Sequence, residues 1–436
     1  MINFYFANVD PRLSLALLLS AIVDAVDIFK AKRFRGAKRF LEFASKSISC
    51  CYLYITPTNR SGLYVLLTAL NVGEGDEVIV TGFTCSAVAE PILQRGAKPV
   101  YVDIKLNTFC LNPDLLVSLI NPRTRVIILQ HTYGFPGPIQ AVMETARRHG
   151  LFVIEDCALA LGSKKEGRWL GTFGDAAVWS FELSKTISVG WGGLIGFNRD
   201  GALAKRVVEI IESAGVQNRL LAAQRLFQGG LSGLLYHHGS PRFLSRYGLA
   251  ALFKFRIFRR SADTPASDLR LPSDRQWRHL LRQWQDLDIT LLKSKAAQRA
   301  YEIILASYDC DSPLARQACA ETYLIRFPLL VKNPERFVAF FAANDIEVGR
   351  WFASPVSCGG KSPALYGYAS GSCPVAEKVC RHIVNLPLHA RLTTDLVAWV
   401  AETLNQYLST HPDEVTFIRS ALVPSFLMDT DETSSN

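Results

Sequence analysis

The chain has 436 residues, with 48 Lys and Arg against 39 Asp and Glu, which gives a formal net charge of +9. Hydrophobic residues make up 49% of it and charged residues 20%, a globular composition that excludes a disordered or collagen-like protein. The length predicts two or three domains, at roughly 100–200 residues each. Because the positive charge is modest and no recognition motif accompanies it, nucleic acid is not an expected partner.

Residues 1–45 are expected to form a helical extension. Their longest apolar run, Leu13 to Val23, contains two serines and is shorter than the roughly 20 residues that a membrane span needs. We interpret it as a helix and not as a signal peptide, since no small-residue cleavage site follows it. The second half of the extension is strongly basic, and we favour a solvated helix face there over contact with an anionic surface.

The ten cysteines include no Cys-x-x-Cys pair, and no histidine lies at zinc spacing from a pair. The sequence therefore indicates no metal site. In a chain of this length without a secretion signal, we expect reduced, structural thiols in a cytoplasmic protein.

Between residues 51 and 197 the pattern changes to alternating strands and helices. Short runs rich in Val and Ile predict buried strands of a largely parallel sheet at Glu77–Val80, Pro99–Ile104, Thr124–Leu129, Leu151–Ile154, Ala176–Phe181 and Gly193–Phe197. A capping Asn112 before Pro113 predicts one helix start, and Gly150 ends a helix expected from about Ile139. Repeated β-α-β units predict an α/β domain with helices on both faces, in which ligands bind at the carboxyl ends of the strands.

Residues 213–262 have an unusual composition. They contain eight basic residues and no acidic one, with Leu and Phe interleaved. Two interpretations stay open: a basic amphipathic patch for lipid or phosphate, and a helical insertion packed on the domain or on a partner subunit.

The remaining sequence completes a prediction of domains. A helix from about Asp274 to Ala306 is expected to lead into a smaller α+β domain, with Tyr323–Val331 among its candidate strands and a last helix at Thr394–Leu408. The expected division is a helical extension at 1–45, a large domain at 46–306 with the insertion at 213–262, a small domain at 307–412, and a partly disordered tail at 413–436.

Three polar residues lie at or just beyond the ends of two of the predicted strands. Asp156 follows one strand, Ser180 ends another, and Lys185 comes five residues later, before a glycine-rich stretch. Pyridoxal phosphate (PLP) requires a lysine for a Schiff base, an acid that keeps the pyridine nitrogen protonated, and donors for its phosphate. The sequence therefore indicates a PLP site at this edge of the sheet.

The chain also resembles a known family, the DegT/DnrJ/EryC1/StrS sugar-nucleotide aminotransferases, which are fold type I PLP enzymes. The resemblance is strong over about 51–200 and fragmentary over about 265–410. It rests on an ordered series of motifs, at Arg60–Tyr64, Leu70–Val80, Gly96–Val100, Val102–Ile104, His131–Gly134, Ile154–Asp156, Gly171–Ala177, Ser180-Phe181 with Lys185, Pro374–Glu377 and Leu386–His389.

The resemblance implies a role for each matching residue. Lys185 would be the Schiff-base lysine and proton shuttle, Asp156 would pair with the pyridine nitrogen, and Ser180 would bind the cofactor phosphate. The phosphate loop of the family falls here on Asn59, Arg60 and Ser61, at an expected helix start that suits an anion.

Several positions depart from the family pattern. Cys85 stands where an aromatic residue usually stacks on the cofactor ring, and Leu159 stands where a glutamine is usual. The usual Asn-x-Arg motif, given by the partner subunit, appears as Asp268-Leu269-Arg270. Because Asp268 would repel a phosphate, only Arg270 keeps an expected contact with the cofactor. These changes bear on substrate choice and could reduce activity.

The function that the resemblance implies is the transfer of an amino group, with glutamate as the expected donor, to a keto-sugar carried on a nucleotide diphosphate, for polysaccharide or glycoconjugate biosynthesis. It also implies a homodimer, because fold type I enzymes build each active site from two chains. Two alternatives remain: a weak or inactive relative that acts as a membrane-peripheral or assembly component, and a PLP enzyme that uses a lipid-linked sugar or another keto compound.

Other polar residues have weaker claims to the site. His131 and His389 are interpreted as hydrogen-bonded structural residues before catalytic ones. Substrate contacts are conceivable for Tyr133, Tyr323, Arg326 and Arg350, although no spacing singles them out.

Overall fold

A computed structural model describes residues 11–26, 35–198, 201–235, 264–308, 321–357 and 361–416, with Leu252, Lys254, Phe255 and Phe258 as isolated positions. Its centre is a seven-stranded sheet in the order β1-β10-β9-β6-β5-β2-β4. The pairings from β9 across to β4 are parallel, and β10 pairs antiparallel with both β1 and β9. The strands are β1 Tyr52–Thr56, β2 Glu77–Thr81, β4 Lys98–Val102, β5 Thr124–Gln130, β6 Phe152–Asp156, β9 Ala176–Ser180 and β10 Gly193–Phe197.

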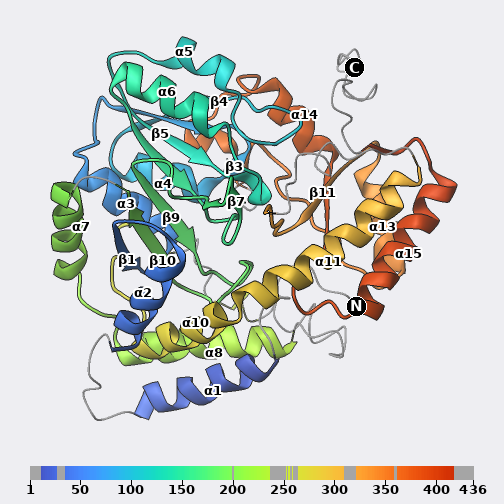
Figure 1. The fold of residues 1–436 in the computed structure, drawn as a ribbon, viewed down its shortest axis with the longest axis horizontal. Coiled ribbons are helices and arrows are strands. Elements are labelled where there is room, and N and C mark those ends of the chain that lie inside the picture. The colour runs from blue at the N-terminus through green and yellow to red at the C-terminus, as the bar shows by residue number, and fades with distance from the viewer. Residues whose placement is uncertain are drawn as a thin grey trace.

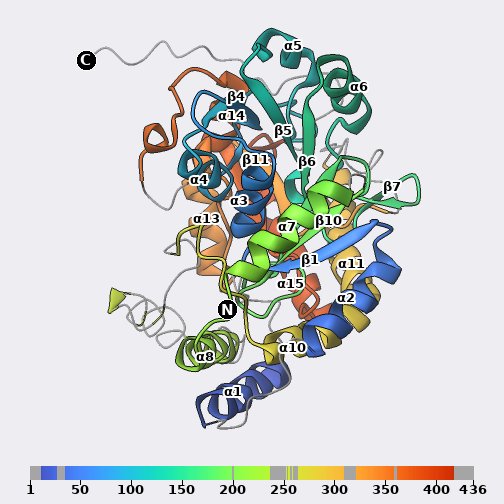
Figure 2. The same cartoon turned by 90° about the vertical axis from the view of Figure 1, so that its left-hand side faces the viewer.

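The expected α/β architecture is confirmed. Helices lie on both sides of the sheet (Figure 2), and buried Val, Ile and Leu side chains of the strands form the centre of the core. The helices around the sheet are α3 Asn59–Ala69, α4 Ser86–Gln94, α5 Leu116–Leu119, α6 Ile139–His149 and α7 Gly201–Ser213. Helix α6 has its expected bounds, because the left-handed Gly150 (φ 65°) ends it.

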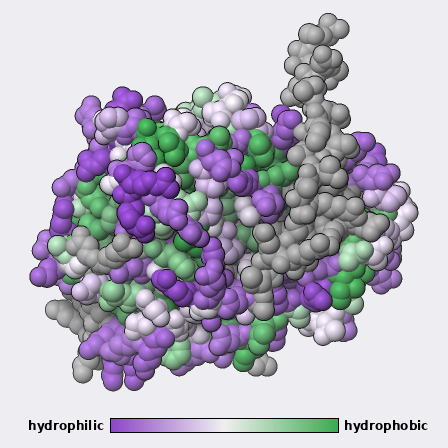
Figure 3. All heavy atoms as spheres, turned by 45° about the horizontal axis from the view of Figure 1, so that its top comes forward, coloured by the Kyte–Doolittle hydropathy of each residue, from purple (hydrophilic) through white to green (hydrophobic). Residues whose placement is uncertain are grey.

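A second, antiparallel sheet in the order β13-β11-β14 follows in the C-terminal part. Its strands are β11 Phe327–Val331, β13 Ile383–Leu386 and β14 Val415–Thr416, and its helices are α13 Pro334–Ala343, α14 Pro374–His382 and α15 Thr394–Thr410. The division into a large and a small domain remains our proposal. On the face turned forward in Figure 3, apolar and polar side chains are interspersed.

Two predictions of local structure were wrong. The expected single helix over 274–306 is two helices, α10 Asp274–Gln285 and α11 Leu287–Ala306, because the backbone leaves the helical region at Asp286. Strand β11 begins only at Phe327, because the backbone before it makes a hydrogen bond to the turn at Tyr133. The expected helix start at Asn112 is confirmed: Asn112 caps a 3₁₀ turn that has Pro113 in its first position, and the four-residue helix α5 follows directly.

The N-terminal extension forms two helices, α1 Pro11–Val26 and α2 Arg35–Ser47. Helix α1 packs along α8, Arg219–Leu235, which lies within the basic segment 213–262. Both views place α1 at the outer limit of the molecule, beyond α8 and α10 (Figures 1 and 2). Among the described residues, no helix is long and apolar enough to cross a membrane.

Candidate active site

Asp156 ends β6 at the centre of the sheet, where parallel strands present their carboxyl ends to a ligand. It is the last residue of the strand and not, as expected, the first beyond it. Its side chain is only 3% exposed, and its Oδ1 accepts hydrogen bonds from the Ala158 N–H at 3.0 Å and from Asn59 Nδ2 at 3.2 Å. Burial raises the pKa of Asp156, while the Ala158 N–H and the charge of Lys185 oppose that shift.

Lys185 lies in a tight loop between β9 and β10. The loop is closed by hydrogen bonds from the Val189 N–H and from the Ser188 hydroxyl to the Phe181 carbonyl. Burial lowers the pKa of the partly buried Lys185 amine, Glu182 opposes that shift, and Arg326 adds to it. Cys85 and Asp156 also act on this pKa. The structure thus brings Lys185 and Asp156 within electrostatic reach of each other, although 29 positions separate them in the chain.

The start of α3 lies against the ends of β9 and β10. Thr58 caps the helix by accepting a hydrogen bond from the Ser61 N–H at 3.0 Å. Gly193 pairs in register with Ser180, and a Cβ at Gly193 would lie 2.5 Å from the carbonyl carbon of Thr58. This close approach, which only glycine permits, brings Ser180 toward the helix start. The first N–H groups of a helix lack partners within it and bind anions.

Two charged residues beside this helix start already have partners. Arg60 pairs with Glu90, with Nη1 and Oε2 2.5 Å apart. Asp268 holds Arg270 through two bonds of 2.7 and 2.8 Å, and the Ser61 hydroxyl donates to the Asp268 carbonyl at 3.4 Å. Arg270 lowers the pKa of Asp268. A contribution of this pair to a partner subunit's site stays a prediction.

The two positions that depart from the family pattern occupy different places. Cys85 ends the short strand β3, Thr84–Cys85, which pairs with Val356 and Ser357. Burial raises the pKa of the Cys85 thiol, and the Ala87 N–H and Lys185 oppose the shift, so this thiol lies within electrostatic reach of Lys185. Its contact with a cofactor ring stays a prediction. Leu159 is buried in the main apolar core. Its contact with a cofactor stays a prediction.

Sequence reasoning gave no special weight to Arg326, which the structure brings to Lys185. Arg326 is buried at the entry to β11, and its guanidinium lies over the Trp351 ring, 4.7 Å from the centroid. The backbone before it is held by a hydrogen bond of 3.0 Å from the Ile325 N–H to the Tyr133 carbonyl. Because 192 positions separate Ile325 from Tyr133, no local pattern could have revealed this contact.

The turn that holds this segment is strained. Tyr133 has a positive φ of 57°, and Gly134 follows at 108°. A Cβ at Gly134 would lie 2.3 Å from the Tyr323 carbonyl oxygen, so the position requires glycine. Tyr133 is buried among aromatic rings, and Tyr323 bonds through its backbone to Ser163.

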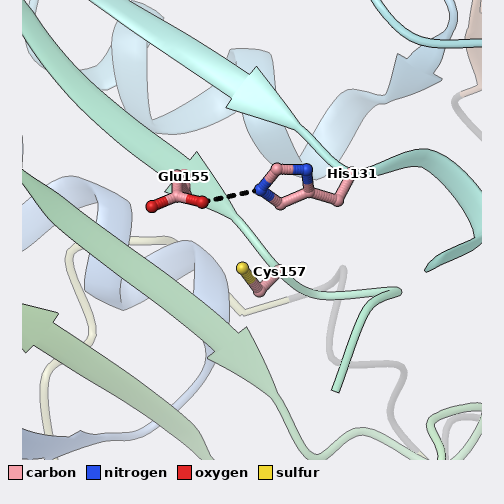
Figure 4. A group of neighbouring side chains, drawn as sticks. All are labelled: His131, Glu155 and Cys157. Carbon is pink, nitrogen blue, oxygen red and sulfur yellow. Dashed lines mark hydrogen bonds and ion pairs between the residues drawn. The ribbon is translucent and has the colours of Figure 1, made fainter. Parts of the chain in front are cut away.

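His131, Glu155 and Cys157 form a buried cluster behind the site (Figure 4). The Gly137 N–H donates to Nδ1 of His131, so the ring proton is on Nε2, which donates to Glu155 at 2.8 Å. Glu155 also accepts three backbone N–H groups, from Gly171, Phe173 and Gly174. Burial raises the pKa of Cys157 well above its ordinary value.

These bonds leave the histidine and the carboxylate no position for a metal ion, and a protonated thiol is a poor metal ligand. The interpretation of His131 as a structural residue is therefore confirmed. Arg350 is also structural, since it donates to the carbonyls of Ile383, Cys380 and Arg381. His389 is buried, three residues after β13, and its role stays a prediction.

A model of the DegT/DnrJ/EryC1/StrS aminotransferase family matches residues 55–405. A pleiotropic regulatory protein of Geobacillus stearothermophilus is 28% identical over 349 residues, which cover 79% of this chain and 82% of that protein. UDP-N-acetyl-3-dehydro-alpha-D-glucosamine 3-aminotransferase of Acidithiobacillus ferrooxidans is 43% identical over 139 residues, or 32% of this chain and 38% of that enzyme.

Solved structures agree with this match. NtdA from Bacillus subtilis, with bound cofactor PMP, has a TM-score of 0.69 at 20% identity and covers 94% of this chain and 86% of its own. Because the family match extends over most of the sequence, the chain belongs to the DegT/DnrJ/EryC1/StrS aminotransferase family and is an aminotransferase with a fold type I architecture.

Proposed function

We propose that this chain moves an amino group from glutamate to a keto-sugar carried on a nucleotide diphosphate, in the biosynthesis of a cell-surface polysaccharide or glycoconjugate. The observation that carries the proposal is the placing of Lys185 and Asp156 within electrostatic reach of each other at one edge of the sheet. The sugar-nucleotide class is supported by the A. ferrooxidans relative, whose name specifies a UDP-linked keto-sugar.

The residues present fit PLP, the cofactor that the family implies. Lys185 would attach the cofactor, Asp156 would pair with its ring nitrogen, and the start of α3 with Ser180 would hold its phosphate. Burial disfavours the charged form of the Asp156 carboxylate, and a cationic ring nitrogen paired with it would offset that cost. The close approach at Gly193 would bring Ser180 beside a helix start that suits an anion. Bound there, PLP supplies an electron sink that makes the Cα–H of an amino acid acidic.

The protein's own part is proton transfer and orientation. The pKa of the Lys185 amine is lowered, which brings it closer to the operating pH and suits it to act as a base. In our proposal Nζ of Lys185 takes the proton from Cα of the donor and later returns a proton to the sugar carbon that receives the amine. Asn59 holds the Asp156 carboxylate in place through its Oδ1.

We propose that Arg326 binds a carboxylate of the donor. A guanidinium matches a carboxylate in charge and in the geometry of its N–H groups. Arg326 is buried, lies over Trp351 and acts on Lys185, so a carboxylate bound there would place the donor's Cα near the amine. We further propose a cytoplasmic homodimer that contacts membranes peripherally through the basic insertion.

The test is spectroscopic. Purified protein with PLP should be yellow, glutamate should shift the visible band, and Lys185→Ala should lose the band while Lys295→Ala, on α11, keeps it. After loading with glutamate, candidate nucleotide keto-sugars are offered, and the right one restores the original band. A colourless protein that PLP does not reconstitute would refute the proposal and favour the alternative of a non-catalytic component.

A further inference from the structure

A glutamine of helix α10 holds the Lys185 loop from outside. Oε1 of Gln283 accepts a hydrogen bond of 2.9 Å from the Ser188 N–H, and Nε2 of Gln283 donates one of 2.8 Å to the Ser188 carbonyl. A glutamine amide carries both an acceptor oxygen and a donor nitrogen, so it can pair with the N–H and the carbonyl of one residue as a neighbouring strand does. We call these two hydrogen bonds the Gln283 clamp.

Ser188 is the residue on which the loop closes. Its hydroxyl donates to the Phe181 carbonyl and accepts from the Gly190 N–H, both at 3.1 Å. Ser188 is fully buried, and its neighbours Ile187 and Val189 are buried with it. The clamp therefore provides hydrogen bonds to two backbone groups that water does not reach. Losing such bonds is costly, so a loop without the clamp should shift until water or other groups replace them.

The same loop carries Lys185, three residues before Ser188. The Lys185 N–H donates to the Glu182 carbonyl at 3.0 Å, which places the amine on a tight turn. Four charged or titratable groups act on this amine, one from its own loop and three from other elements: Glu182, Asp156, Arg326 and Cys85. Because such interactions depend on distance, the position of the loop determines how strongly each of them acts.

Helix α10 is well anchored on its other sides. In both ribbon views it lies between α2 and α8 (Figures 1 and 2). Trp284, the residue after Gln283, is buried and packs edge-on against Phe40 of α2, with 5.4 Å between the ring centroids. Its Nε1 donates to the Ser47 hydroxyl at 3.3 Å. The clamp thus joins the Lys185 loop to a helix whose own position is fixed by the core.

We propose that Gln283 is a positioning residue: through the backbone of Ser188 it holds the Lys185 loop so that the amine stays partly buried and within electrostatic reach of Asp156. The inference rests on the proposed role of Lys185 as the reactive amine. Loss of the clamp lets the loop move toward water. Because burial is the largest cause of the lowered pKa of Lys185, that pKa should then rise toward its ordinary value.

The experiment measures the Lys185 amine in the full-length protein, after hydroxylamine has removed any bound PLP. Acetic anhydride labels uncharged amines, and mass spectrometry of the peptide that contains Lys185 follows the labelling against pH. We expect Gln283→Met, which is similar in size but makes neither hydrogen bond, to raise the midpoint by about one pH unit. Hydrogen exchange of the amides of residues 186–190 should become about tenfold faster. The matched control is Gln285→Met, at an exposed glutamine of the same helix, which should behave like the wild type.

Two results would overturn the proposal: a labelling midpoint that Gln283→Met leaves unchanged, even if the protein becomes less stable, or an equal rise in Gln285→Met. Circular dichroism checks that the variants fold. If Gln283→Met does not, Gln283→Asn takes its place with the same expectation, since its amide is one methylene too short for both hydrogen bonds. A protein that never binds PLP would refute the proposed function, whereas the labelling midpoint would still decide the role of Gln283.

Discussion

Lys185 lies among charges of both signs, and their balance determines what the site can bind. Glu182 and Asp156 favour its charged form, while burial and the cationic Arg326 favour its neutral form. A substrate carboxylate that pairs with Arg326 would remove part of the repulsion between the two cations. Donor binding and the basicity of the amine are therefore coupled through one guanidinium.

Replacing Arg326 should separate the two half-reactions. We expect Arg326→Leu to raise KM for glutamate by about 10- to 100-fold, since a hydrogen bond to a charged group contributes roughly 1.5–3 kcal/mol. The sugar half-reaction and the PLP band should change little. Stopped-flow absorbance with each substrate measures both, and Arg326→Lys should recover part of the loss. An equal loss with both substrates would show that Arg326 does not select the donor.

The Asp268–Arg270 pair makes a second prediction at the residue scale. Asp268 lies beside the helix start proposed for the cofactor phosphate and holds the guanidinium of Arg270 with both oxygens. Asp268→Asn removes a negative charge and releases Arg270, so the protein should bind PLP about tenfold more tightly. Titration of the apoprotein measures the affinity, and pyridoxal without phosphate should show no gain. Weaker PLP binding would mean that the pair positions Arg270 for the cofactor.

At the scale of elements, α1 packs against the Lys185 loop and supports it. It is fixed by apolar contacts to α8 and by polar contacts to α10, and its inner residues reach Leu183. Of these contacts, the bond between Ser20 and His279 depends on pH. Burial lowers the pKa of His279 to about 4, and the nearby Arg282 and Arg278 add to the shift. His279 is therefore neutral in the folded protein at neutral pH.

Acid should weaken the attachment of α1 to α10. A histidine whose pKa is depressed on folding contributes stability that is complete above its unfolded pKa of about 6.5 and is lost as the pH falls toward 4. Between pH 7 and pH 5 we expect α1 to lose about 2 kcal/mol of protection. Hydrogen exchange of α1 amides measures it, and His279→Gln should abolish the pH step. A step of equal size in the His279→Gln protein would assign it to another group.

At the scale of the whole molecule, the strands and the Lys185–Asp156 juxtaposition were predictable from the sequence. Apolar runs fix the strands, and the carboxyl ends of parallel strands share an edge, so residues at those ends meet. The contact of Arg326 with the site depends instead on a strained turn at Tyr133, which has no periodic signature. The break at Asp286 was missed for a similar reason, because helical residues flank it on both sides.

The N-terminal extension shows the same limit in another form. Its helices were predictable from composition, yet their place was not, because α1 meets residues about 160 to 260 positions away. Such pairings depend on the complementary shapes of faces that are distant in the chain. The basic character of residues 213–262 was evident from the sequence. The structure adds that its described helix, α8, packs on α1.

The seating of α1 on Leu183 has a consequence for the boundaries of the catalytic unit. The match to the family model begins at residue 55, yet Leu183 of the loop that carries Lys185 is buried against Leu17 and Ala21, which lie upstream of that point. A protein truncated to the region that the family model matches would expose Leu183 and Leu226 to water. The helix that covers the Lys185 loop therefore lies outside the region that the family model matches.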